Sequence, residues 1–159
     1  MTTTIANATL TVTLTESLTL NGTQQGASNV KTFADIDEIS KRILTITTNE
    51  ATIATFSGAV ASAGHYNDSA VRYMRFTNKD DTNFLTLTFR NQDNDEVAIK
   101  VDAGQSFIWC GDNANGMSSV FNATQDADAA SDTAFGSLTN IQADANTATC
   151  DMEMLIASV

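Results

Sequence analysis

The sequence contains no proline among its 159 residues, where average usage would give about eight. Its turns must therefore come from glycine, asparagine and aspartate, which tolerate left-handed backbone conformations. Long apolar runs are also missing: no stretch approaches about 18 uninterrupted apolar residues, so we expect no membrane-spanning helix. The opening MTTTIANATL has neither a basic start nor an apolar run, and it predicts no signal peptide and a chain that starts in a cytoplasm.

Positive charge is scarce, with 8 Lys and Arg against 19 Asp and Glu and a formal net charge of -11. The cations are scattered along the chain and form no basic stripe. Nucleic-acid binding depends on Lys and Arg displacing counterions from phosphates, so this composition argues against DNA, RNA and anionic membranes as partners. The acidity instead favours solubility through mutual repulsion.

Cysteine and histidine are nearly absent, with two Cys and one His. One cysteine pair cannot build the disulfide framework of a small secreted domain. Cys150 shares a strand face with Met152 and Met154 and is predicted to be buried; a Cys110–Cys150 bridge stays an open alternative. His65 is expected in an exposed loop of small residues, and with the two cysteines it is one ligand short of a zinc site.

Carboxylates are plentiful, and Asn91, Asp93 and Asp95 alternate as at the start of a calcium-binding EF-hand loop. The glycine and the glutamate that such a loop requires are replaced by Glu96 and Asp102, so a solvated hairpin tip is expected instead. A weaker acidic group occupies a later loop, at Asp126, Asp128 and Asp132. We expect no metal site.

Motifs for catalysis are missing, because the sequence has no phosphate-binding glycine loop, dinucleotide fingerprint or nucleophile elbow. The sequence therefore predicts no enzyme, no catalytic residue and no cofactor. Aromatic residues make up 7%, few for the groove of a two-carboxylate glycosidase. Trp109 alternates with Phe107 and is expected in the core; the other interpretation is a sugar-stacking platform with Tyr66 and Tyr73.

What the chain has in abundance is period-two alternation, which puts every second side chain on one face of a strand. The first stretch has apolar residues at Leu10, Val12, Leu14, Leu18 and Leu20. Between them lie Thr9, Thr11, Thr13, Thr15, Ser17 and Thr19. This pattern predicts a strand with a buried leucine face and a threonine face toward water or a neighbour, followed by a tight turn at Asn21-Gly22.

Further extended segments are predicted near 29–33, 42–48 and 51–56. Four alternating segments between 71 and 110, separated by polar turns, predict a meander of the kind found in sandwiches and barrels. Residues 122–147 predict a long irregular loop, with a helical turn near 126–134 and anchors at Phe135, Leu138 and Ile141. The segment 148–156 alternates again and predicts a terminal strand.

These segments together predict an all-β fold, a jelly-roll or β-sandwich of antiparallel strands. We expect an N-terminal arm over residues 1–8 and a single β-sandwich domain over residues 9–159.

Two segments resemble a known group of proteins: TLTVTLTESLTLNG (9–22) and VRYMRFTNKDDTNFLTLTFRNQDNDEVAIKVDAGQSFIW (71–109). A strand, an Asn-containing turn, a strand, and an apolar strand running into Asp-Ala-Gly-Gln-Ser-Phe resemble small virion proteins of tailed bacteriophages, marine ones especially. Among these are capsid decoration, or cement, proteins. The resemblance covers about a third of the chain and implies a β-sandwich or jelly-roll that sits as a trimer on the outer shell.

We therefore expect a non-enzymatic virion protein that stabilises a capsid by oligomerising, as a homotrimer, on the major capsid protein. The arm and the first strand are expected to add onto a neighbour by backbone hydrogen bonds. The candidate interface residues are Thr2, Thr3, Thr4, Thr9, Thr11, Thr13 and Thr15. Two alternatives stay open: a tail, fibre or adaptor component of the virion, and a carbohydrate-binding module.

Overall fold

The computed structural model describes residues 6–59, 62, 64–111, 116–117 and 138–159. All regular structure in these ranges is β-strand, which confirms the predicted all-β class. The chain divides into two compact units, Met1–Asp37 and Glu38–Val159. The first unit contains β1 (Ala8–Thr15), β2 (Thr19–Leu20), β3 (Thr23–Gln24) and β4 (Ser28–Ile36). The second contains β5 (Glu38–Ile46), β6 (Ala51–Ser57), β7 (His65–Asn67), β8 (Val71–Asn78), β9 (Leu85–Asn91), β10 (Glu96–Val101), β11 (Ser106–Cys110), β12 (Leu138–Ala145) and β13 (Cys150–Ser158).

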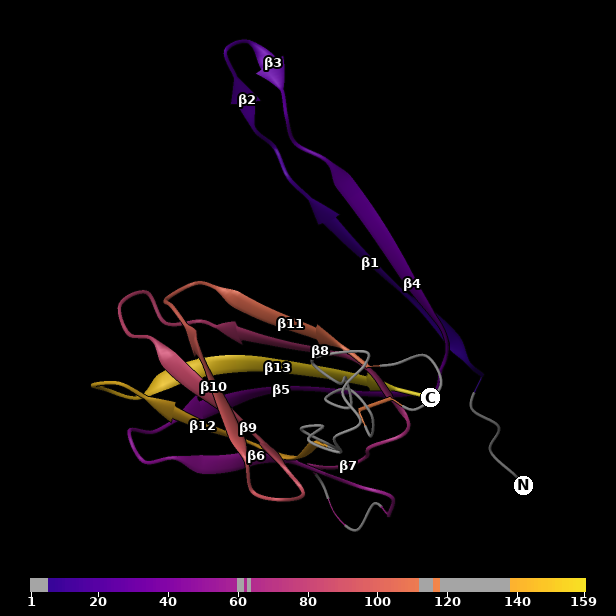
Figure 1. Cartoon of the computed structure of the whole chain (residues 1–159), viewed down its shortest axis with the longest axis vertical. Coiled ribbons are helices and arrows are strands. Elements are labelled where there is room, and N and C mark those ends of the chain that lie inside the picture. The colour runs from indigo at the N-terminus through magenta and orange to yellow at the C-terminus, as the bar shows by residue number, and fades with distance from the viewer. Residues whose placement is uncertain (1–5, 60–61, 63, 112–115, 118–137) are drawn as a thin grey trace, which may run out of the picture. The chain divides into compact units, whose positions relative to one another are not determined.

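The second unit is a β-sandwich (Figure 1). One sheet has the strand order β10-β9-β12-β6-β7 and the other the order β11-β8-β13-β5. Neighbouring strands are antiparallel except for β6 and β7, which run parallel. The sandwich sheets thus begin at β5, whereas residues 9–37, which the sequence placed in the sandwich, belong to the first unit.

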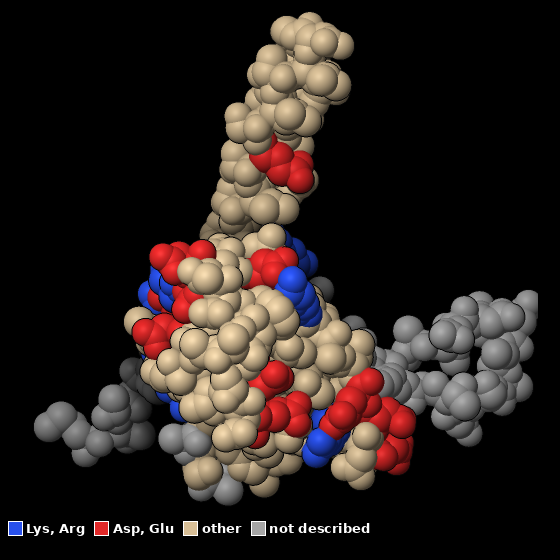
Figure 2. Space-filling model, turned by 90° about the vertical axis from the view of Figure 1, so that its left-hand side faces the viewer, with Lys and Arg blue, Asp and Glu red and all other residues tan. Residues whose placement is uncertain are grey.

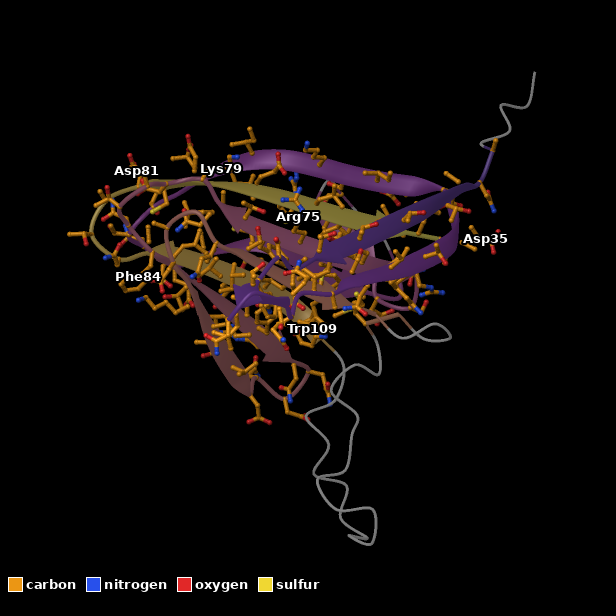
Figure 3. All side chains as sticks on the ribbon, turned by 90° about the horizontal axis from the view of Figure 1, so that it is seen from above. Asp35, Arg75, Lys79, Asp81, Phe84 and Trp109 are labelled. Carbon is orange, nitrogen blue, oxygen red and sulfur yellow. The ribbon has the colours of Figure 1, made fainter. Side chains whose placement is uncertain are left out.

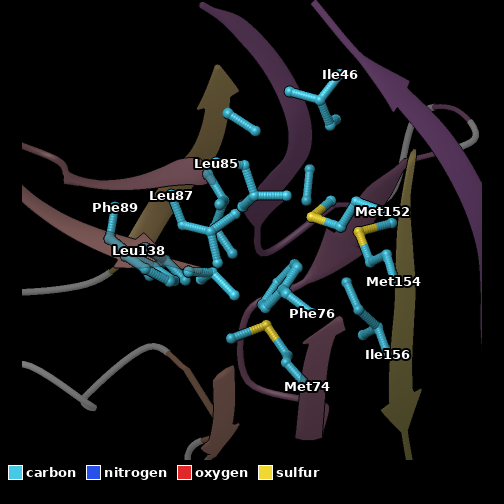
Figure 4. Packing of buried hydrophobic residues seen from close by; sticks show 14 of the residues in the cluster. Ile46, Met74, Phe76, Leu85, Leu87, Phe89, Leu138, Met152, Met154 and Ile156 are labelled. Carbon is cyan, nitrogen blue, oxygen red and sulfur yellow. The ribbon is translucent and has the colours of Figure 1, made fainter. Parts of the chain in front are cut away.

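The core of the sandwich fills the space between its two sheets (Figure 4). Each sheet contributes fully buried side chains, among them Leu85, Leu87, Phe89 and Ile141 from one and Met74, Phe76, Met152, Met154 and Ile156 from the other. The Phe76 and Phe89 rings meet edge to face with centroids 6.4 Å apart, a favoured aromatic geometry that ties the sheets together. Each such side chain contributes about 1.5–3 kcal/mol when fully buried.

The four strands predicted between 71 and 110 are present as β8, β9, β10 and β11, but they do not form a meander. β9 pairs with β10, whereas β8 and β11 pair with each other in the opposite sheet. The chain therefore changes sheet after β8 and again after β10. Alternation could not reveal this, because a strand with one buried face has the same pattern in either layer.

The prediction of an irregular loop over residues 122–147 is wrong for the last part of that range. Residues Leu138–Ala145 form β12, the central strand of the five-stranded sheet. Leu138 and Ile141, expected as loop anchors, are fully buried within it. The strand buries the small residues Ala143 and Ala145, which weakens its apolar signal.

The remaining predictions for this loop concern the helical turn near 126–134, the anchor Phe135 and the three aspartates, and all lie outside the described residues. The predicted terminal strand is confirmed as β13. Within the described ranges, no helix has the length and apolar character needed to cross a membrane.

The turn between β8 and β9 is held by side-chain caps (Figure 3 labels Lys79, Asp81 and Phe84 there). The Asp80 carboxylate accepts hydrogen bonds from the backbone nitrogens of Asn83, at 2.6 Å, and Thr82, at 2.8 Å. These bonds favour the charged form and lower the Asp80 pKa. This turn is therefore held by side-chain hydrogen bonds and not by a proline.

Candidate interaction surface

The first unit is a long β-hairpin in which β1 pairs with β4 and, at the tip, β2 pairs with β3 (Figure 1). Asn21 and Gly22 have φ angles of 50° and 78°, as in a type I′ turn, which confirms the turn predicted from Asn-Gly. At Gly26 the two arms approach closely, because a Cβ there would lie 2.0 Å from the backbone oxygen of Glu16. The hairpin thus depends on a glycine in each of two places.

The cross-strand register sorts the hairpin side chains onto two faces. One face carries the pairs Leu10–Phe33, Val12–Lys31 and Leu14–Asn29. The other carries Thr11–Thr32, Thr13–Val30 and Thr15–Ser28. The hydroxyl oxygens of the last pair lie 3.4 Å apart. Thr11 and Thr15 of β1 therefore face hydroxyl side chains of β4, whereas Thr13 faces Val30.

The predicted burial of the leucine face is wrong: Leu10 and Val12 are half-buried, and the leucines from Leu14 onward are exposed. Leu14 and Leu18 are both 56% exposed, and Leu20 is 59% exposed. On the opposite face Val30 is 63% exposed. A two-stranded ribbon has no second layer of its own, so these four side chains stay in water unless other protein covers them.

Of the seven candidate interface residues, Thr9, Thr11, Thr13 and Thr15 are exposed on β1. The other three, Thr2, Thr3 and Thr4, lie outside the described residues. The role of β4 as the partner of β1, and with it the exposure of Val30, was not predicted. The signal was present, because an Asn-Gly turn between two extended segments is typical of a hairpin.

The hairpin also has open edges. Within the described part of the chain, β1 and β4 form a two-stranded sheet, so the outer edge of each has no neighbouring strand. Such an edge presents backbone N–H and C=O groups that a strand of another chain can pair with. This is the geometry that strand addition requires.

Charge is almost absent from the hairpin surface, which is nearly all tan in Figure 2. Between Ala8 and Ile36 the sequence has three charged residues, Glu16, Lys31 and Asp35. Residues 38–159 therefore carry most of the net charge of -11, and the sandwich surface shows several acidic groups in the same view.

The single histidine lies in a strand, not in the exposed loop that the sequence predicted. His65 opens β7 and is half-buried, and its Nε2 lies 2.6 Å from the Ser57 hydroxyl oxygen of β6. The described residues contain no group of three or more His, Cys, Asp and Glu side chains that could hold a metal ion.

No disulfide joins the two cysteines, which removes the bridge left open above. Cys150 is 1% exposed, as predicted, while Cys110 is exposed. Cys110 lies in register with Tyr73, which pairs with Ala157. Ala157 is seven residues along β13 from Cys150, about 23 Å of strand, so the two sulfurs are too far apart to bond.

The hairpin tip predicted at residues 91–95 is confirmed. The buried Asn91 side-chain oxygen accepts hydrogen bonds from the backbone nitrogens of Asp93, at 2.9 Å, and Asp95, at 2.8 Å. Trp109 is half-buried and packs edge to face on Phe89 with centroids 4.9 Å apart. This packing agrees with the core interpretation of Trp109.

Comparison of the chain with protein-family models, curated proteins and solved structures gives no match. Function has to be inferred from the hairpin and the sandwich themselves.

Proposed function

We propose that the chain is a non-enzymatic structural protein that assembles through its N-terminal hairpin, as a homotrimer decorating the outer surface of a capsid. The observation that carries the proposal is the exposure of Leu14, Leu18 and Leu20 on a ribbon with no layer of its own. Residues 9–22, one of the two segments that resemble phage decoration proteins, form the first arm of this hairpin and its tip.

The free energy that burial of the exposed apolar side chains of the hairpin would contribute agrees with a role in assembly. Full burial of an aliphatic side chain contributes about 1.5–3 kcal/mol, and the hairpin has four that are more than half exposed, Leu14, Leu18, Leu20 and Val30. Covering them would contribute roughly 4–7 kcal/mol per chain. This is close to the lower end of the entropic cost of association, about 4 kcal/mol, so backbone pairing along the open edges is needed for a stable complex.

Electrostatic repulsion between copies also favours contact through the hairpin. Copies of a chain with a net charge of -11 repel one another wherever their acidic surfaces meet. The hairpin carries a net charge of about -1 and offers the approach with the least repulsion. An acidic exterior also suits a protein outside a shell and disfavours one that lines packaged DNA.

Sedimentation equilibrium of the purified chain tests the assembly. The expected mass is three times the 16.9 kDa of one chain. A variant with Leu14→Ser, Leu18→Ser and Leu20→Ser should sediment as a monomer with an unchanged sandwich. The control is Val97→Ser, because Val97 is 40% exposed on β10 and lies outside the hairpin. A wild-type monomer at every concentration, or a triple variant that keeps its trimer, would contradict the proposal.

Electron microscopy of the particle that contains this chain tests the location. The expected result is density for the chain on the outside of the head, with the hairpin against a neighbouring subunit. Density on the tail would reassign the chain to a tail, fibre or adaptor component.

A further inference from the structure

A pocket of about 410 Å³ lies between β5 and β6, which belong to opposite sheets of the sandwich. Its apolar walls include Leu44, Ile46 and Ile53. Small residues at Ala51, Ala54 and Ala143 leave the space open. The volume falls within the range of about 300–1,000 Å³ that is usual for small-molecule sites, and the lining combines these apolar residues with four threonines and one arginine.

One cation, Arg42, lines this pocket from the inner face of β5. Its Nη2 donates hydrogen bonds to two neutral groups, the Tyr66 hydroxyl at 3.2 Å and the Ile53 carbonyl at 3.5 Å. Tyr66 in turn donates to the Ser40 hydroxyl at 2.9 Å, which orients the phenol. Gly64, at a φ of 83°, lies so close that a Cβ there would be 3.3 Å from Nη2. The guanidinium is therefore held in place from several sides.

One further donor of this guanidinium has no partner in the described part of the chain. The Arg42 Nε is buried and makes no hydrogen bond there. No carboxylate of the described residues lies within 4.0 Å of Arg42, whereas Arg75 pairs with Glu153 and Arg90 with Glu96. Glu153 itself is in register with Ile43, on the opposite face of the sheet from Arg42.

Arg42 is half-buried in this pocket with no acid of the described residues beside it, whereas charges withdrawn from water are normally paired. A carboxylate is the group that pairs most favourably with a guanidinium. We infer that the pocket binds a monocarboxylate with an apolar body, of which a medium-chain fatty acid is the simplest member. The carboxylate lies against Arg42 and the hydrocarbon lies along Leu44 and Ile46. From Arg42 to Ile46 the strand rises about 13 Å, enough for an extended chain of eight carbons.

A titration of the ¹⁵N-labelled full chain with sodium octanoate, observed by NMR, tests this inference. Octanoate should shift the backbone amides of Gly64 and Ala143 in a saturable manner. Octanol, which lacks the charge, and acetate, which lacks the apolar body, should each bind at least tenfold more weakly. Octanol binding as tightly as octanoate would overturn the role of Arg42.

Three variants test the charge of Arg42 and the open volume of the pocket separately. Arg42→Met keeps the length of the side chain and should lose at least tenfold in octanoate affinity. The control Arg72→Met should bind as the wild type does, because the Arg72 guanidinium bonds the Ser69 carbonyl and does not line the pocket. Ala51→Phe places a large side chain in the pocket from an exposed position at its rim and should abolish octanoate binding although Arg42 is intact. This variant tests whether octanoate occupies the pocket even where Arg42→Met fails to fold.

Two results would overturn the assignment. One is octanoate affinity that is unchanged in a folded Arg42→Met variant or in Ala51→Phe. The other is tighter binding of an N-acetylated tripeptide ending in leucine than of octanoate, which would make a peptide carboxyl terminus the occupant.

Discussion

Replacing Leu87 with alanine should destabilise the sandwich strongly. Leu87 is fully buried in β9, which is paired on both sides, with Ile99 of β10 and Ala143 of β12 as its cross-strand neighbours. The substitution deletes three carbon groups at about 0.8 kcal/mol each, or about 2.4 kcal/mol of transfer free energy. The cavity adds to this, because a strand held on both edges cannot collapse into it and Ala143 is too small to fill it. The expected total is about 3–5 kcal/mol.

Urea unfolding followed by Trp109 fluorescence measures this loss. Trp109 contacts Phe89, two residues along β9 from Leu87, so its emission reports on the sandwich. The matched control is Leu14→Ala, which removes the same atoms from a side chain that is 56% exposed in the hairpin. It should change the free energy of the Trp109 transition by less than about 0.5 kcal/mol. Equal losses at the two positions, or a loss below about 1 kcal/mol at Leu87, would refute the assignment of core and hairpin.

Three further substitutions have defined outcomes. Gly26→Ala should raise amide exchange in the hairpin and leave sandwich exchange unchanged, because its Cβ would meet the Glu16 backbone. Glu153→Gln should lower stability at neutral pH and make stability depend less on pH in the acid range. Hydrogen bonds from Arg75 and a neighbouring lysine lower the Glu153 pKa. The stability that the charged Glu153 contributes is therefore full above the ordinary pKa of 4.5 and is lost as pH falls through the folded-state pKa. Asn78→Ala should cost about 1–3 kcal/mol in urea unfolding, because the side chain is 1% exposed and bonds three backbone groups.

Much of the fold could be predicted from the sequence wherever large apolar residues alternate with polar ones. β9 was predicted because Leu87 alternates with threonines along the strand. β13 was predicted because Met154 alternates with a glutamate. The type I′ turn at Asn21-Gly22 was predictable for a local reason, since these residue types tolerate positive φ. Such signals are contained within a few residues of chain.

The features that the sequence did not predict depend on residues far apart. β12 buries Ala143 and Ala145 at the centre of a sheet, and alanines at these positions give little contrast with the polar residues between them. The assignment of β8 and β9 to opposite sheets depends on how the turn at residues 79–84 directs the chain, which alternation does not encode. The pocket at Arg42 likewise needs two strands from different sheets, so only the three-dimensional structure brings its residues together.

The same pattern has different consequences in the two units. Leu87 alternates with threonines and is fully buried, while Leu14 alternates with threonines and is exposed, because one strand has a second sheet above it and the other does not. An apolar ribbon with open edges promotes uncontrolled pairing unless something restricts its contacts. In the proposed assembly, the negative charge carried mainly by residues 38–159 would supply that restriction, since it disfavours contacts between the acidic surfaces of two copies. On this reasoning, added salt should broaden the contacts that the wild-type copies make, whereas the Leu14, Leu18 and Leu20 variant should remain monomeric at low salt.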